Sequence, residues 1–122
     1  MTNIFTDQEK FMIAGDQTVD TYNESQYTMY VKLINEEFGE LQTAIAAEDK
    51  VEQLDALIDI LVVTVGAIHS MGACGEGAWN AVMATNFAKI DAETGKVRKR
   101  EDGKILKPEG WKAPELKPFL KE

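Results

Sequence analysis

The sequence is poor in residues that build disulfides and nucleophilic sites. One cysteine and one histidine occur in 122 residues, Cys74 and His69. A single cysteine cannot form an intramolecular disulfide, which fits a reducing compartment. We expect Cys74 to be packing or surface filler, because no nearby residue obviously activates its thiol. His69 follows an apolar residue near a predicted helix end, so we expect it to be structural.

Long hydrophobic runs are also missing. The longest largely apolar stretch, residues 60–68, is too short to cross a membrane. Residues 1–15 lack the basic start, apolar stretch and cleavage site of a signal peptide. A cytoplasmic protein with no membrane partner is the expectation. With 44% hydrophobic and 28% charged residues, the chain predicts one globular domain, 1–122.

Basic side chains are scarce in the first 88 residues, which hold fourteen acids against three bases, a net charge of −11. Residues 89–122 hold ten bases against seven acids, a net charge of +3. The acidic part argues against a nucleic-acid partner. The basic part could contact phosphates or fold back onto the acidic part.

Helical periodicity predicts most of the structure. Four helices are expected, over residues 6–15, about 23–47, about 51–71 and about 75–90. Thr6 is the predicted N-cap of the first helix, and Asn23 or Ser25 that of the second. The short turn at 48–50 makes the two long helices antiparallel neighbours.

The apolar positions indicate which helix faces are buried. The stripe of the second helix has intervals of three and four and consists of Tyr27, Tyr30, Ile34, Phe38, Leu41 and Ile45. Trp79 of the fourth helix is expected to pack in the core. Asp102-Gly103 predicts a hairpin turn, and three prolines predict an extended end. The predicted fold is all-α, an antiparallel bundle of about four helices (core about 6–90) with a short C-terminal hairpin and tail (91–122).

Carboxylates concentrate on the two long helices. Six of them recur at helical spacings: Glu36, Glu37, Glu40, Glu52, Asp55 and Asp59. Since the two helices are antiparallel, the two clusters reach overlapping heights. A solvated face is the commoner explanation of a charge run. However, Met29 and Leu33 continue the angular sector of the first cluster, so we expect these acids to lie against other protein.

A partly buried acidic cluster must take up protons, admit water or bind cations. Two carboxylates about 4 Å apart repel by on the order of 4 kcal/mol at an effective dielectric constant of roughly 20. Lys32 is the only base close in sequence. Oxygen ligands alone favour a hard divalent cation, Mg²⁺ or Mn²⁺ rather than Zn²⁺. At this point a metal site and a solvated face both remain open.

Glu36-Glu37-x-x-Glu40 followed by Glu52-x-x-Asp55 resembles the paired acidic signature of the MazG-like superfamily of all-α nucleoside triphosphate pyrophosphohydrolases. That superfamily includes phosphoribosyl-ATP pyrophosphohydrolase and the dimeric dUTPases. The resemblance covers about residues 25–116.

The later part of the chain adds to the resemblance. Asn86-x-x-Lys89, the stretch REDGKILKP and Trp111-x-x-Pro114 are similar to short phage and bacterial members of the superfamily. The EExxE motif alone is weak, but its combination with a second acidic helix and an Asn/Lys pair is fairly specific.

The resemblance implies Mg²⁺-dependent hydrolysis of a nucleoside triphosphate between its α and β phosphates, with Mn²⁺ as a substitute ion. The metal ligands it implies are Glu37, Glu40, Glu52 and Asp55, with Asp59 as a further candidate. Many members place the aspartate of the second motif directly before the aliphatic run, which would align it with Asp59. In the other register Glu52 and Asp55 fill the motif, and Asp59 is an additional carboxylate one turn on. The implied catalytic residues are Glu36 and Glu37, with Glu36 either a further ligand or the group that orients and deprotonates water.

The resemblance also implies contacts to the substrate and between subunits. Asn86 and Lys89 are the expected polyphosphate contacts, and Arg100 and Lys104 could add to them. Lys89 could equally be a solvated lysine at a helix end, and Trp111 could stack on a base. A homodimer or homotetramer is expected, since residues 60–68 are apolar on nearly every side.

Two other hypotheses stay open. A non-enzymatic acidic module that binds a basic protein would need the carboxylates but neither Mg²⁺ nor the Asn/Lys pair. Alternatively, the same fold could act on phosphoribosyl-ATP in histidine synthesis.

Overall fold

The structure is a computed structural model that describes residues 2–121. Its α-helices are α1 (Ile4–Ala14), α2 (Glu24–Ala46), α3 (Lys50–Ser70) and α4 (Gly75–Phe87), and a short 3₁₀ helix follows at Lys117–Phe119. Within the described residues the only strand-like pairing is two isolated antiparallel bridges, Ile90 to Val97 and Lys99 to Ile105. The predicted all-α class with four helices is confirmed.

Side-chain caps fix where the helices begin. Asn23 and Asp49 cap α2 and α3, each with a side-chain oxygen that accepts from a backbone N–H of the first turn. The first helix begins earlier than predicted. Asn3 is its N-cap, and the Thr6 hydroxyl accepts from the Asn3 backbone N–H at 2.9 Å in a capping box. The prediction of Thr6 as the N-cap is therefore wrong.

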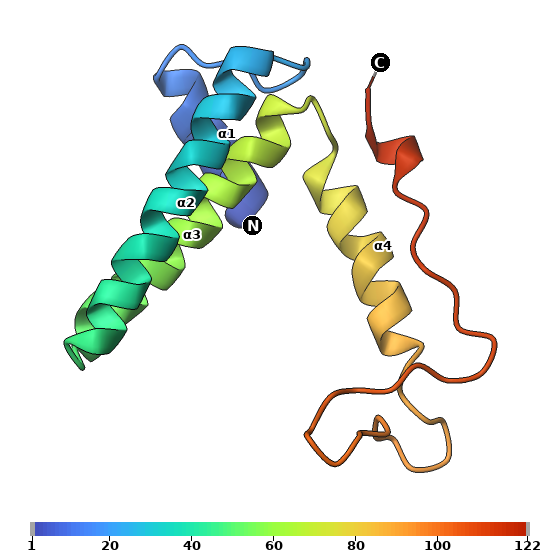
Figure 1. Ribbon diagram of the computed structural model, residues 1–122. Coiled ribbons are helices and arrows are strands. Elements are labelled where there is room, and N and C mark those ends of the chain that lie inside the picture. The colour runs from blue at the N-terminus through green and yellow to red at the C-terminus, as the bar shows by residue number, and fades with distance from the viewer. Residues whose placement is uncertain (1, 122) are drawn as a thin grey trace. The chain divides into compact units, whose positions relative to one another are not determined.

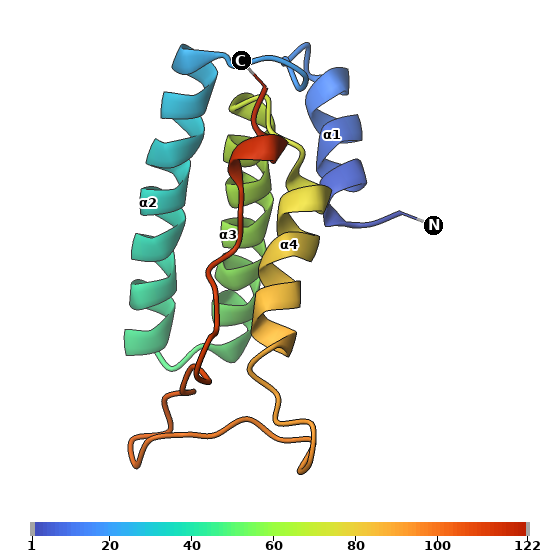
Figure 2. The same ribbon diagram turned by 90° about the vertical axis from the view of Figure 1, so that its right-hand side faces the viewer.

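A tight reversal joins the two long helices. Glu48 takes a left-handed conformation with φ of 55°, which turns the chain directly after α2. Asp49 then starts α3, so α2 and α3 run antiparallel and side by side (Figures 1 and 2). The shorter α1 packs against α3.

The core lies where α1, α2 and α3 meet. Met12, Tyr30 and Ala67, one from each helix, form its buried cluster. Gly66 lets the backbone of α3 approach the Tyr30 ring closely, because a Cβ atom there would lie 2.3 Å from a ring carbon. His69 is buried and its Nε2 lies 2.8 Å from a backbone carbonyl oxygen of α1, as expected of a structural histidine.

Some residues predicted to be buried are not. Phe38, Ile45 and Trp79 are each 53% exposed. Their apolar spacing is that of a buried stripe, but spacing does not reveal whether another element covers that face. No single helix in the described residues is both long and apolar enough to span a membrane.

The chain forms two compact units that meet in sequence after α3. One unit runs to Gly75 and takes in the chain from Leu120, and the other is Glu76–Phe119. In the second unit the predicted hairpin turn forms at Gly103, where φ is 90° and the Arg100 N–H donates to the Lys104 carbonyl at 2.8 Å. It is held by single bridges and no regular strands. The chain then returns alongside α4 (Figure 1).

Candidate functional site

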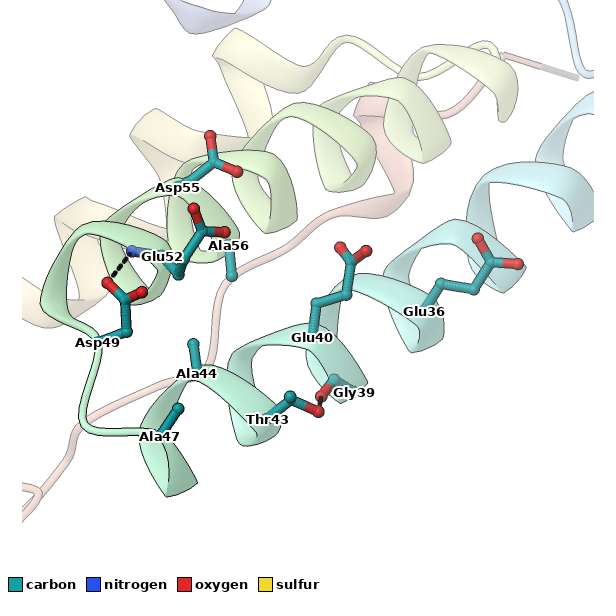
Figure 3. Close-up of a pocket in the computed structure, with 10 residues that line it drawn as sticks. All are labelled: Glu36, Gly39, Glu40, Thr43, Ala44, Ala47, Asp49, Glu52, Asp55 and Ala56. Carbon is teal, nitrogen blue, oxygen red and sulfur yellow. Dashed lines mark hydrogen bonds between the residues drawn. The ribbon is translucent and has the colours of Figure 1, made fainter.

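An open groove of about 720 Å³ lies between α2 and α3 near the turn that joins them. Its acidic lining residues are Glu36, Glu40, Asp49, Glu52 and Asp55. Figure 3 shows the carboxylates of α2 and those of α3 projecting to the same side of the helix pair. Small residues keep the groove open, because Gly39, Ala44 and Ala56 offer no side chain beyond Cβ to fill it.

Glu37 on α2 is the most perturbed acid of this group. Its pKa is raised from the ordinary 4.5 to about 7, first by a side-chain hydrogen bond with Glu40 and then by burial. The negative charges of Glu40, Asp59 and Asp55 raise it further. Two of these neighbours come from α3, so acids of both helices act on one carboxyl group.

The pKa of Asp59 on α3 is also raised. Burial raises its pKa above the ordinary value, and the charges of Asp55 and Glu40 add to the rise. The charges that raise the pKa of Asp59 come from α2 as well as from α3, so Asp59 belongs to the same electrostatic group as Glu37.

No basic side chain of the described residues forms an ion pair with these acids. Across residues 2–121 the one ion pair is between Arg100 and Asp102. The Oε2 atom of Glu37 is buried, and no N–H or O–H group of the described residues donates a hydrogen bond to it. A buried carboxylate oxygen without a partner loses its hydration and gains nothing in return, so a bound cation would relieve both burial and repulsion.

The residues present fit a hard divalent cation by donor type. All the donors are carboxylate oxygens, which Mg²⁺ and Mn²⁺ prefer. In the described part of the chain, no group of three or more His, Cys, Asp or Glu side chains is positioned to hold a metal ion as it stands. Cation binding therefore requires rotamer changes, which are open to the exposed side chains of Glu40 and Glu52.

The structure brings together all six acids predicted from the sequence. Those lining the groove are Glu36, Glu40, Glu52 and Asp55. Glu37 and Asp59 join them through their interactions with Glu40 and Asp55. Both aspartates of α3 lie in the group, so the two registers considered for this helix do not exclude each other.

Two polar lining residues, Asp49 and Thr43, were missed by the sequence reasoning. Asp49 faces the groove while its Oδ1 accepts from the Glu52 backbone N–H at 3.1 Å (Figure 3). Thr43 lines the groove and its hydroxyl donates to the Gly39 carbonyl at 3.1 Å. Their only sequence signal was their place beside the turn between the two acidic helices.

The predicted substrate contacts all lie in the unit Glu76–Phe119. Lys89 donates from Nζ to the Asn86 side-chain oxygen at 3.1 Å. The guanidinium of Arg100 is already engaged by Asp102, with contacts of 3.1 and 2.6 Å. Lys104 is exposed, and its backbone N–H donates to Asp102.

Comparison with protein families gives a match over more than half of the chain. A family model described as phosphoribosyl-ATP pyrophosphohydrolase matches residues 11–86. The match includes both acidic helices and all six acids, and it ends before the basic C-terminal part. No curated protein matches the sequence.

Proposed function

Since the chain belongs to the phosphoribosyl-ATP pyrophosphohydrolase family, part of the MazG-like superfamily, and is therefore a nucleotide pyrophosphohydrolase, we propose that it acts on nucleoside triphosphates with Mg²⁺. The bond cleaved lies between the α and β phosphates, and the products are a nucleoside monophosphate and pyrophosphate. The family match sets aside the hypothesis of a non-enzymatic acidic module. As the sequence predicts, the proposed enzyme is cytoplasmic.

One observation supports this proposal above the others. Glu37 carries a buried, unpartnered oxygen and a raised pKa, and the charges that raise it come from α2 and α3 together. Solvated acids on an ordinary helix face would not repel one another across two helices. A group of this kind is typical of a site whose charge is balanced by a ligand.

The residues proposed to hold Mg²⁺ are Glu37, Glu40, Glu52, Asp55 and Asp59. When bound, the cation would polarise phosphoryl oxygens and lower the pKa of a coordinated water. On their own, the carboxylates repel a polyphosphate, so the groove selects against substrate that arrives without a cation. Glu36 lines the groove and is exposed, so it is free to accept the proton of the attacking water.

Phosphoribosyl-ATP is the second candidate substrate, because the matching family is described by that activity. The bond broken would be of the same kind, so the carboxylate site serves both candidates equally. The choice depends on groups that recognise the base and sugar. A comparison of kcat/KM for phosphoribosyl-ATP and for common and deoxynucleoside triphosphates decides between the two.

The test is pyrophosphate release from this panel of nucleotides, measured with Mg²⁺ and with EDTA. We expect release with Mg²⁺ and none with EDTA. In ¹⁸O-labelled water the label should enter the nucleoside monophosphate if water attacks the α phosphorus. Glu40→Gln should lower kcat/KM by on the order of 100-fold or more, since the stabilisation that a metal supplies is worth several kcal/mol.

Glu24→Gln is the matched control. It makes the same change in charge on the same helix, but Glu24 is exposed in the first turn of α2, away from the groove. Unchanged activity in this control assigns the effect of Glu40→Gln to the site. Full activity of a folded Glu40→Gln enzyme would remove the site assignment, and release of inorganic phosphate in place of pyrophosphate would contradict the proposed reaction.

A further inference from the structure

A second cluster of chemically distinctive residues lies in the unit Glu76–Phe119, outside the matched family segment. Its centre is Trp111, whose indole N–H donates to the backbone carbonyl of Thr85 on α4 at 2.7 Å. The backbone N–H of Trp111 donates to the Pro108 carbonyl at 3.1 Å. These two bonds hold the ring in a defined place against the last turns of α4.

Two lysines approach this ring, one from just after α4 and one from the loop that leads to Trp111. Lys89 Nζ lies 5.1 Å from the Trp111 ring centroid, and Lys107 Nζ lies 4.9 Å from it. Neither lysine forms an ion pair in the described residues. Two ammonium groups therefore meet at one aromatic ring without a carboxylate to balance them, although like charges repel.

The ring also borders open space. A groove of about 440 Å³ runs between the end of α4 and the loop that carries Trp111. Its lining includes the small residues Ala84, Ala88 and Gly110 and the charged residues Glu109 and Lys112, whereas Lys89 and Lys107 approach the ring from outside this lining. The volume falls within the range of small-molecule sites, which is roughly 300–1,000 Å³.

From this combination we infer that Trp111, Lys89 and Lys107 form a nucleotide-binding site, in which the base stacks on the Trp111 indole and the phosphates pair with the two lysines. An aromatic face accepts any base by stacking. Ammonium groups pair with phosphate as point charges on flexible stems. The cation–π contacts are weak at exposed sites, so the lysines can leave the ring for a phosphate.

Asn86 supports this arrangement. Its side-chain oxygen accepts from Lys89 Nζ at 3.1 Å, which keeps that ammonium group near the ring. Lys107 is exposed and has no such tether. Lys89 is thus the preplaced phosphate contact, and Lys107 is the one that moves to the ligand.

The inference deepens the proposed function, because it takes the ligand to be the nucleotide that the enzyme hydrolyses. It can still be tested separately. Trp79→Phe leaves Trp111 as the only tryptophan, so the intrinsic fluorescence of that protein reports on the stacking ring. With Mg²⁺ present, titration with an α,β-methylene nucleoside triphosphate, which cannot be cleaved between its α and β phosphorus atoms, should quench this fluorescence, and inorganic tripolyphosphate should not produce the same quench.

Three variants separate binding from a merely structural role of Trp111. Lys89→Met and Lys107→Met keep the aliphatic stems and remove the charges, and each should raise the Kd for the triphosphate about tenfold and flatten its dependence on salt. Trp111→Ala, followed by calorimetry, should also raise the Kd about tenfold. Lys96→Met is the matched control, since this exposed lysine lies in the same unit and makes no contact with the ring.

The outcomes distinguish this site from the proposed reaction. Quenching that needs both lysines, in a protein that hydrolyses no nucleotide, would support the site and contradict the reaction. A triphosphate Kd that stays the same in Lys89→Met and Lys107→Met, with Trp111 fluorescence unmoved by nucleotide, would overturn the site. Because the lysine variants leave Trp111 and its hydrogen bonds in place, that result would not be a failure to fold.

Discussion

At the scale of single residues, the raised pKa of Glu37 has a measurable consequence. The pKa of Glu37 is about 7 in the folded chain against 4.5 ordinarily, and its hydrogen bond with Glu40 is the largest cause. Between these two pH values the folded state holds more protons than the unfolded state, so stability falls as pH rises. Below pH 4.5 both the folded and the unfolded state hold this proton, and above about pH 7 the loss of stability is complete.

We therefore predict that Glu37→Gln makes the metal-free protein more stable at about pH 8 and leaves its stability nearly unchanged at about pH 4. The gain should be on the order of 1 kcal/mol, because the side chain is only partly buried and water screens the repulsion. Urea unfolding in EDTA at both pH values measures it. Glu24→Gln should show no such pH-dependent gain, and an equal gain in both variants would contradict the assignment of the repulsion to this group.

Loss of the Glu37 proton at higher pH should also strengthen the binding of cations. At about pH 8 Glu37 is largely deprotonated, so Mg²⁺ should bind more tightly there than at pH 5 and should restore the stability lost in EDTA. Thermal unfolding of the wild-type chain with and without Mg²⁺ at the two pH values measures this. A stabilisation by Mg²⁺ that does not increase with pH would contradict a carboxylate site.

At the scale of elements, the packing of α2 on α3 depends on one glycine. A Cβ atom at Gly66 would lie 2.3 Å from Tyr30 Cε1, and Tyr30 is only 5% exposed, so its ring has nowhere to move without disturbing the core. Gly66→Ala should destabilise the protein by about 1–3 kcal/mol through overpacking, although alanine favours the helix. It should also lower activity, because α2 and α3 together hold the carboxylates.

Gly39→Ala tests the same substitution without the clash. Gly39 lies in α2, where an added Cβ atom would meet no neighbouring residue within 4 Å, so alanine should stabilise the protein by about 0.5–1 kcal/mol. Chemical unfolding of both variants gives the comparison. If the two variants change stability in the same direction, the close approach of α3 to Tyr30 is not what holds these helices together.

Most of the helices and their pairing could be predicted from the sequence, because helix periodicity and helix caps are local features. Asn23 was among the expected caps, and the short turn predicted the antiparallel pairing of α2 and α3. Asn3 was missed because its capping box is completed by Thr6, where a Glu or Gln is the usual signal. The exposure of Phe38 could not be predicted, since it depends on which element covers that face.

Part of the candidate site could likewise be predicted from the sequence and part could not. The six acids are repeated at helical spacing, so their meeting could be predicted from the turn and the helix rise. The rise in the pKa of Glu37 could not be predicted, because it depends on side-chain rotamers. The approach of Lys89 to Trp111 depends on how an irregular loop returns to α4, and no periodic pattern encodes that.

At the scale of the whole molecule, an exposed apolar face on α3 supports the proposed homodimer or homotetramer. The exposed residues of this face follow helical spacing and are Leu54, Leu57, Ile58, Leu61 and Val62. Soluble monomers rarely expose a contiguous apolar face of this kind. A second copy that presents the same face would cover it in a two-fold arrangement.

Leu61→Glu should then shift the protein towards monomer in analytical ultracentrifugation, because a two-fold interface would bring two buried charges together. Ile13→Glu is the control, since Ile13 is exposed on α1 and lies outside this face. A wild-type chain that sediments as a monomer at all concentrations would remove the proposed oligomer.

The central claim is that α2 and α3 together hold a divalent cation. The most direct measurement is a titration with Mn²⁺ followed by electron paramagnetic resonance, without nucleotide, on the wild-type chain, Glu40→Gln, Asp55→Asn and Glu24→Gln. We predict that Glu40→Gln and Asp55→Asn, one on each helix, weaken the binding of the same ion and that Glu24→Gln does not. Mn²⁺ binding that is identical in all four folded proteins would contradict the claim.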